Sequence, residues 1–175
     1  EELLTFFELR SQSVQGQLDG IIPSTSEGQS ADSSALVDAS ALGGASVGET
    51  LLTPTKIYVK PVLALIDKLG ADKIKGISHI TRGGLYESIP RSIPGGLTAR
   101  VARKAIRTLP IFDLIAAVGV VSDHDMLSTF NMGVGMTIIV SRGDAPLALN
   151  VLRANGEDAY VIGDIVRGSE KLIIE

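Results

Sequence analysis

The sequence contains no cysteine, no tryptophan and only two histidines among its 175 residues. Without cysteine the chain has no disulfides, no thiolate metal sites and no cysteine nucleophile. His79 and His124 alone do not make a transition-metal cluster, so no metal site is expected. Aromatic residues amount to 4% of a chain that is 45% hydrophobic, so its core must consist mainly of Ile, Val, Leu and Ala.

An excess of positive charge is missing as well. The net charge of −4 argues against a nucleic-acid partner, because binding a phosphate backbone requires a basic surface. The short basic group formed by Arg100, Arg103, Lys104 and Arg107 is interpreted as solvated surface. No apolar run approaches the roughly 18 residues of a membrane helix, and residues 1–4 lack the basic start of a signal peptide. We therefore expect a cytoplasmic protein without a membrane segment, or a plastid one in a plant or alga.

Residues 1–48 differ in composition from the rest of the chain. They carry most of the acidic excess, and residues 24–48 are mainly Ser, Gly and Ala, which is typical of a flexible linker. This predicts a boundary near residue 48, with one domain over residues 49–175. Apolar residues at roughly helical spacing in residues 1–18 predict a short amphipathic helix, with an isolated piece of a longer element as the alternative. The start at Glu1 suggests a fragment or a processed product.

Strand-like and helix-like patterns alternate after residue 48. Thr53 and Pro54 predict the start of a helix that ends at Gly70. The other expected helices span residues 110–118, a segment opened by Ser122, and residues 144–154. Expected strands lie at 74–80, 97–102 and 137–140, and two apolar stretches, 159–166 and 171–174, are expected to pair as a terminal hairpin. These elements predict an α/β protein of the α+β type, a mixed β-sheet covered by helices.

Two glycine-rich segments are the candidate binding elements. Gly83 and Gly84 follow the apolar run that ends at residue 80, and the free amides of residues 85–88 would suit a phosphate or carboxylate. Gly133 and Gly135 lie one residue apart, so they leave one face of an extended chain bare of side chains. Plain turns and close packing are the structural alternatives. Together the two segments predict a shared cleft for an anion or nucleotide.

Four segments of the chain resemble a known enzyme family in order and spacing. They are LTPTKIYVK (52–60), HITRGGLYESIPR (79–91), FNMGVGM (130–136) and NGEDAYVIG (155–163). These segments are similar to the C-terminal half of phosphoribosylformylglycinamidine cyclo-ligase, the aminoimidazole ribonucleotide synthetase family, over residues 50–175. Members of that family activate the formyl amide oxygen of formylglycinamidine ribonucleotide with ATP and Mg²⁺, and the imidazole ring then closes.

The resemblance also implies roles for individual residues and partners. His79 and Thr81 would be catalytic, and the implied substrate- or phosphate-binding residues are Gly83, Gly84, Glu87, Arg91, Asn131, Gly133 and Gly135. An Arg91 that only pairs with Glu87, or an Asn131 that only caps a turn, is the structural alternative. ATP and Mg²⁺ would be held mainly by an N-terminal domain that this chain lacks, so the isolated chain is expected to be inactive. A homodimer is implied for the full-length family.

The sequence departs from the family pattern at three points. Arg82 stands where the family has the first of three glycines, the family's His-Ser-Asn-Gly segment is not recognisable in residues 1–48, and the N-terminal domain is absent. One alternative function is a non-catalytic remnant or a phosphate-ligand-binding module. Another is a different member of the superfamily, such as a selenophosphate synthetase, thiamine-monophosphate kinase or hydrogenase maturation protein. The segment from Gly84 to Arg91 argues against these other members of the superfamily.

Overall fold

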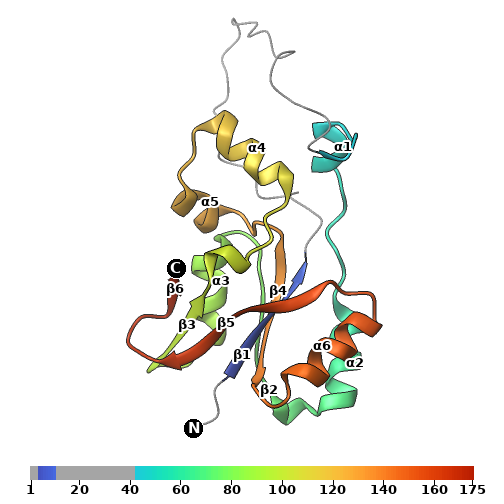
Figure 1. Cartoon of the computed structure of the whole chain (residues 1–175), viewed down its shortest axis with the longest axis vertical. Helices are drawn as coiled ribbons and strands as arrows, with labels where there is room; N and C mark the ends of the chain where they lie inside the picture. Colours follow the sequence, from blue (N-terminus) through green and yellow to red (C-terminus); the bar gives the residue numbers. More distant parts are fainter. Residues whose placement is uncertain (1–3, 11–41) are drawn as a thin grey trace, which may run out of the picture.

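The structure is a computed structural model that describes the backbone of residues 4–10 and the full residues 42–175 (Figure 1). Its centre is a six-stranded sheet with the strand order β2-β4-β1-β5-β3-β6. The strands are β1 (Leu4–Arg10), β2 (Ile74–His79), β3 (Leu97–Val101), β4 (Val134–Ser141), β5 (Ala159–Arg167) and β6 (Leu172–Ile174). Neighbouring strands run antiparallel except β3 and β6, which are parallel. The expected mixed sheet covered by helices is confirmed.

In the described part of the chain, six helices and three short 3-10 turns connect these strands. The helices are α1 (Val47–Leu51), α2 (Val59–Leu69), α3 (Gly84–Ser88), α4 (Pro110–Gly119), α5 (Asp123–Thr129) and α6 (Ala145–Ala154). The 3-10 turns are η3 (Ala71–Lys73), η4 (Ile89–Ser92) and η5 (Arg103–Ala105). The expected helices over residues 110–118, after Ser122 and over residues 144–154 are confirmed, as are the expected strands.

The sheet separates two hydrophobic cores. Ile138 and Val140 of β4 pack with Leu65 and the helices α2 and α6, which lie side by side near the foot of the molecule in Figure 1. Ile139, between them in sequence, packs on the opposite face with Phe112 of α4 and with α3 and α5. Successive side chains of a strand point to opposite faces, so β4 contributes to both cores.

The helix predicted in residues 1–18 is wrong where the structure describes that segment. Residues Leu4–Arg10 form β1, which lies in the middle of the sheet between β4 and β5. The adjacent residues Phe6 and Phe7 interrupt the alternation of apolar and polar residues in this segment, so its sequence does not show the period of a half-buried strand. Residues 1–3 and most of the expected linker at 24–48 lie outside the described residues, and the boundary near residue 48 stays a prediction.

The helix that ends at Gly70 begins later than Thr53 and Pro54 indicate. Its first residue is Val59, and the Thr53 hydroxyl instead donates to the Glu49 carbonyl oxygen in the last turn of α1. Pro61 explains this start, since it is the third residue of α2 and its missing N–H would have no partner within the helix there. The predicted end is confirmed, because Gly70 follows α2 with φ of 93°.

The predicted terminal hairpin is also wrong. β5 uses its two edges to pair with β1 and β3, which leaves no edge for the last strand. β6 pairs in parallel with β3 instead, with Ala99 opposite Leu172 and Val101 opposite Ile174. The turn between β5 and β6 crosses over the end of β3, where the Gly168 amide donates to the Gly96 carbonyl oxygen.

Candidate functional site

The two glycine-rich segments meet at the end of the sheet where β2 finishes and β4 begins. The Ile80 amide donates to the Gly135 carbonyl oxygen at 2.9 Å. One residue earlier, His79 lies opposite Met136 in the antiparallel register. The loop that carries Gly83 therefore leaves the sheet beside the segment that carries Gly135, as a shared cleft requires.

Gly135 occupies a bulge in β4. The register between β1 and β4 passes from Leu9 opposite Met136 to Arg10 opposite Val134, so Gly135 is the extra residue. A bulge bends the strand and changes the direction of the peptide groups around it. The Gly135 carbonyl oxygen is thereby free to accept from Ile80 on the neighbouring strand.

Gly84 is needed for close packing of backbone on backbone. Its φ is +54°, it is buried, and a Cβ there would overlap the carbonyl oxygen of Leu127 and lie 2.8 Å from that of Phe130. These two carbonyls belong to the C-terminal end of α5, so the start of α3 is pressed against that end. The structural alternative, close packing, therefore holds for Gly84. A ligand at this loop would have to contact the residues next to Gly84 instead.

The exposed residues of the loop surround Gly83. Thr81 and Arg82 are exposed, and the Thr81 carbonyl oxygen accepts from the amide of Gly84. Gly83 has a φ of +88°, and a Cβ there would collide with the carboxylate of Glu87, which folds back over the loop. Arg91 lies 3.3 Å from that carboxylate at i,i+4 spacing. The structural alternative for Arg91 is therefore present, and both side chains stay solvent-exposed.

Asn131 and Gly133 build a tight turn before β4. The buried Asn131 side chain accepts through Oδ1 from the Gly133 amide at 2.9 Å. Met132 and Gly133 both have positive φ, 55° and 105°, and a Cβ on Gly133 would lie 3.1 Å from the Arg107 carbonyl oxygen. The turn is thus held by an Asn side chain and packed against the segment that precedes α4, as the structural alternative for Asn131 states.

His79 connects the loop to a hollow on the surface. Its exposed ring packs edge-on against the buried ring of Tyr58, with centroids 6.0 Å apart. The hollow has a volume of about 400 Å³ and mostly apolar walls, formed by Lys56, Ile57, Tyr58, Val59, Val62, Leu63, His79 and Met136. We call this hollow the α2 groove. It opens next to the meeting point of the glycine segments, because His79 and Met136 belong to both.

An ion pair beneath the α2 groove was not foreseen from the sequence. Lys56 Nζ lies 2.8 Å from Glu157 Oε2, and the Glu157 side chain is only 4% exposed. A carboxylate this deeply buried needs a cation partner, since burying a charge alone is costly. The two residues lie in the first and last of the four family-like segments, and that shared membership is the one signal in the sequence that could have indicated them.

The basic group in and just after β3 is largely neutralised by ion pairs. Three of its four side chains contact carboxylates: Arg100 with Asp164 at 2.9 Å, Arg103 with Asp123 at 2.7 Å and Arg107 with Asp158 at 3.1 Å. Paired in this way, they do not form the continuous basic face that a phosphate backbone would need.

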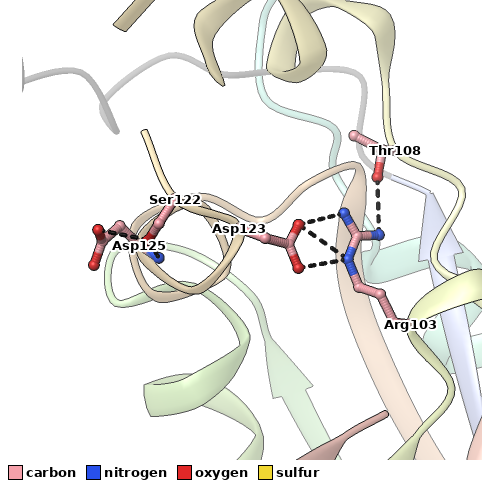
Figure 2. Close-up of polar contacts among 5 residues, drawn as sticks. All are labelled: Arg103, Thr108, Ser122, Asp123 and Asp125. Carbon is pink, nitrogen blue, oxygen red and sulfur yellow. Dashed lines mark hydrogen bonds and ion pairs between the residues drawn. The ribbon is translucent and has the colours of Figure 1, made fainter. Parts of the chain in front are cut away.

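Arg103 fixes the position of α5 (Figure 2). Its guanidinium donates to both oxygens of Asp123, the first residue of α5, and reaches Thr108 Oγ1 at 3.5 Å. These hydrogen bonds hold the pKa of Asp123 below its ordinary value and raise the pKa of Arg103, while partial burial opposes both shifts. Ser122 caps the same helix by accepting from the Asp125 amide, as its position in the sequence predicts. α5 is therefore anchored at the end opposite to its contact with Gly84.

The part of the chain that the structure describes has neither a cluster of metal ligands nor a membrane-spanning helix. Among residues 42–175, no three His, Asp or Glu side chains gather as a group that could hold a metal ion. No helix in that part of the chain is both long and apolar enough to cross a bilayer.

Comparison with known proteins places this fold and its glycine junction in a family. The chain belongs to the family described as AIR synthase related protein, C-terminal domain, whose model matches residues 17–175. Relatives of the chain include phosphoribosylformylglycinamidine cyclo-ligases. The one from Caldicellulosiruptor saccharolyticus is 48% identical over 129 residues, which cover 74% of this chain and 37% of the relative. The one from Alkaliphilus metalliredigens is 38% identical over 169 residues, covering 97% and 42%.

These comparisons confirm the resemblance found in the sequence. The chain spans less than half the length of the curated relatives it matches. Solved structures of two proteins share its fold. Escherichia coli HypE, a hydrogenase maturation protein, aligns with a TM-score of 0.58 at 16% identity, and the match covers 99% of this chain and 46% of HypE. A HypE–HypF complex aligns with a TM-score of 0.57 at 17% identity, and the match covers 100% of this chain and 50% of the matched chain. At such identities the likeness shows the fold alone.

Proposed function

We propose that the chain acts as the C-terminal half of a cyclo-ligase that converts formylglycinamidine ribonucleotide to aminoimidazole ribonucleotide. The reaction phosphorylates an amide oxygen, which turns a poor leaving group into a good one, and an internal nitrogen then closes the ring. Such an enzyme must hold two phosphate-bearing ligands in line and neutralise their charge. In this proposal His79 and Thr81 act at the reacting atoms, while the loops around Gly83 and Gly133 bind the substrate, as predicted from the sequence.

One observation carries the proposal most directly. The hydrogen bond between Ile80 and Gly135 joins the two glycine-rich segments, so exposed His79, Thr81 and Arg82 lie near the segment that contains the buried residues Gly133 and Gly135. If the segments lay on opposite sides of the sheet, they could not share a ligand. Identity of up to 48% with cyclo-ligases, against 16–23% with hydrogenase maturation proteins of this fold, favours the purine reaction over the others.

The proposal assigns ATP and Mg²⁺ to a part of the enzyme outside the described residues. In the part of the chain that the structure describes, no three His, Asp or Glu side chains gather as a group that could hold a metal ion. The isolated chain would therefore bind the ribonucleotide without turning it over. A cytoplasmic location and a homodimer of the complete enzyme belong to the same proposal.

Calorimetric titration with formylglycinamidine ribonucleotide tests binding by the isolated chain. We expect saturable binding that is weakened by Thr81→Ala and by His79→Ala, because both residues are exposed next to the proposed substrate loop. Val118→Ala, an exposed substitution on α4, is the matched control and should leave the affinity unchanged. A folded chain that shows no saturable heat would contradict the proposal.

Arg82 favours a second candidate function, a module that binds phosphate ligands without catalysis. A bulky cation replaces a small residue at the entrance of the loop, and its side chain is exposed. In this case inorganic phosphate or any phosphorylated metabolite should bind as tightly as the ribonucleotide. A clear preference for the ribonucleotide in the same titration would reject this candidate.

A further inference from the structure

The exposed wall of the α2 groove is an unusual surface. Ile57 is 79% exposed and Leu63 is 58% exposed, with Val59 between them at the start of α2. The opposite side of α2 packs against α6 and the sheet, so the helix is amphipathic with an apolar stripe left over. Contiguous apolar surface of this kind on a protein marks a site that another surface covers.

The groove has a defined floor. The buried ring of Tyr58 forms it, and the ion pair between Lys56 and Glu157 fixes the segment that precedes α2. Such support means that the exposed aliphatic side chains project from a fixed backbone. A rigid apolar hollow with a few polar groups at its edge has the composition of the core of a protein interface.

We infer that the α2 groove is the docking surface for the half of the cyclo-ligase that this chain does not span. The inference rests on the proposed function. More than half of each relative's length lies outside the match, so a large partner segment exists in those enzymes. Because His79 and Met136 line both the groove and the glycine junction, a body seated in the groove lies against the proposed site.

The position of the α2 groove beside the proposed site favours the partner half of the enzyme, rather than a second copy of this chain, as the occupant of the groove. Phosphoryl transfer requires the ATP-holding part to reach the reacting atoms, and the groove is the apolar surface that borders them. A second copy seated there would cover His79 without supplying a nucleotide. The partner surface should accordingly be apolar where it meets Ile57 and Leu63, with an acidic or hydrogen-bonding group near His79.

The absence of cysteine in the chain gives a direct test. Leu63→Cys is labelled with a maleimide in the isolated chain and in a chimera, in which this chain replaces the matching segment of the Alkaliphilus metalliredigens relative. Val118→Cys on α4, far from α2 in Figure 1 and 66% exposed, is the matched control. Ile57→Cys provides a second variant in the groove. Mass spectrometry of the labelled peptide excludes cysteines of the relative.

The expected result is labelling of Leu63→Cys and Ile57→Cys about tenfold slower in the chimera than in the isolated chain, since reaction then awaits opening of the interface. Val118→Cys should react equally in both. Equal rates for the groove variants in an active chimera overturn the inference and leave the proposed function intact. Protection in an inactive chimera supports the docking surface while the proposed function fails. Concentration-dependent protection in the isolated chain identifies a second copy and overturns the inference.

Discussion

Asp123 accepts hydrogen bonds from Arg103 through both carboxylate oxygens, the shortest at 2.7 Å, and this pair joins the start of α5 to the segment after β3. The far end of α5 presents the Leu127 carbonyl oxygen to Gly84. The pair thus fixes the helix on which the loop between β2 and α3 rests.

The first prediction concerns the pH dependence of stability. The pKa of Asp123 is lower in the folded chain, so its contribution is present above the unfolded value of about 3.9 and is lost as the pH falls through the folded value. Because the carboxylate is largely exposed, Asp123→Asn should reduce the free energy of unfolding by only about 0.5 kcal/mol at neutral pH. Urea denaturation at neutral and acid pH measures the difference. An equal loss of unfolding free energy at neutral and at acid pH would contradict a role for the charge of Asp123.

The second prediction concerns Gly84. In Gly84→Ala the new Cβ meets the Leu127 carbonyl oxygen, so we expect a loss of about 3 kcal/mol in the free energy of unfolding. Gly156→Ala is the control, because Gly156 also has a positive φ, 84°, but has open space around it. That control should lose about 1 kcal/mol from the backbone conformation alone. Equal losses, measured by urea denaturation, would mean that the contact with α5 contributes nothing.

The third prediction concerns the ion pair below the α2 groove. Lys56→Met leaves the Glu157 carboxylate buried without its cation and should cost about 2–3 kcal/mol, less than a fully buried pair because Lys56 is 28% exposed. Glu157→Gln in the Lys56→Met background should recover part of the loss. Chemical denaturation of both single variants and the double variant gives the coupling energy. Strictly additive losses would show that the two side chains do not stabilise each other.

The fourth prediction concerns Arg82 and rests on the proposed function. The side chain is exposed, so Arg82→Gly should change the free energy of unfolding by no more than about 0.5 kcal/mol. The affinity for the ribonucleotide should fall at low salt, and the difference should shrink at high salt as the charge is screened. Calorimetric titration at two ionic strengths measures this. Tighter binding by the variant would show that Arg82 obstructs the loop.

Local signals in the sequence were sufficient for most helices and for the glycine loops. Ser122 and Asp125 marked the start of α5, and Gly70 the end of α2, because caps depend on residues within one turn. Thr53 led to a wrong prediction of the start of α2 for the same local reason. It is a good capping residue, but its hydroxyl donates to a carbonyl oxygen at the end of α1. The competing constraint, Pro61 in the first turn of α2, decided where that helix begins.

Long-range pairing could not be predicted in this way. Nothing within residues 171–174 indicates that β6 pairs with β3, since the choice depends on β5 having both edges occupied. The position of β1 between β4 and β5 was also missed, because the adjacent residues Phe6 and Phe7 interrupt the alternation that indicates a strand. The contact of Gly84 with Leu127 and the pair of Lys56 with Glu157 likewise join residues far apart in the chain.

Turnover by the chimera with the Alkaliphilus metalliredigens relative tests the central claim most directly. The account predicts ATP-dependent formation of aminoimidazole ribonucleotide by the chimera and its loss in Thr81→Ala and His79→Ala, with Val118→Ala as active as the parent chimera. A folded chimera that binds ATP and the ribonucleotide but forms no product, under conditions in which the intact relative does, would contradict it.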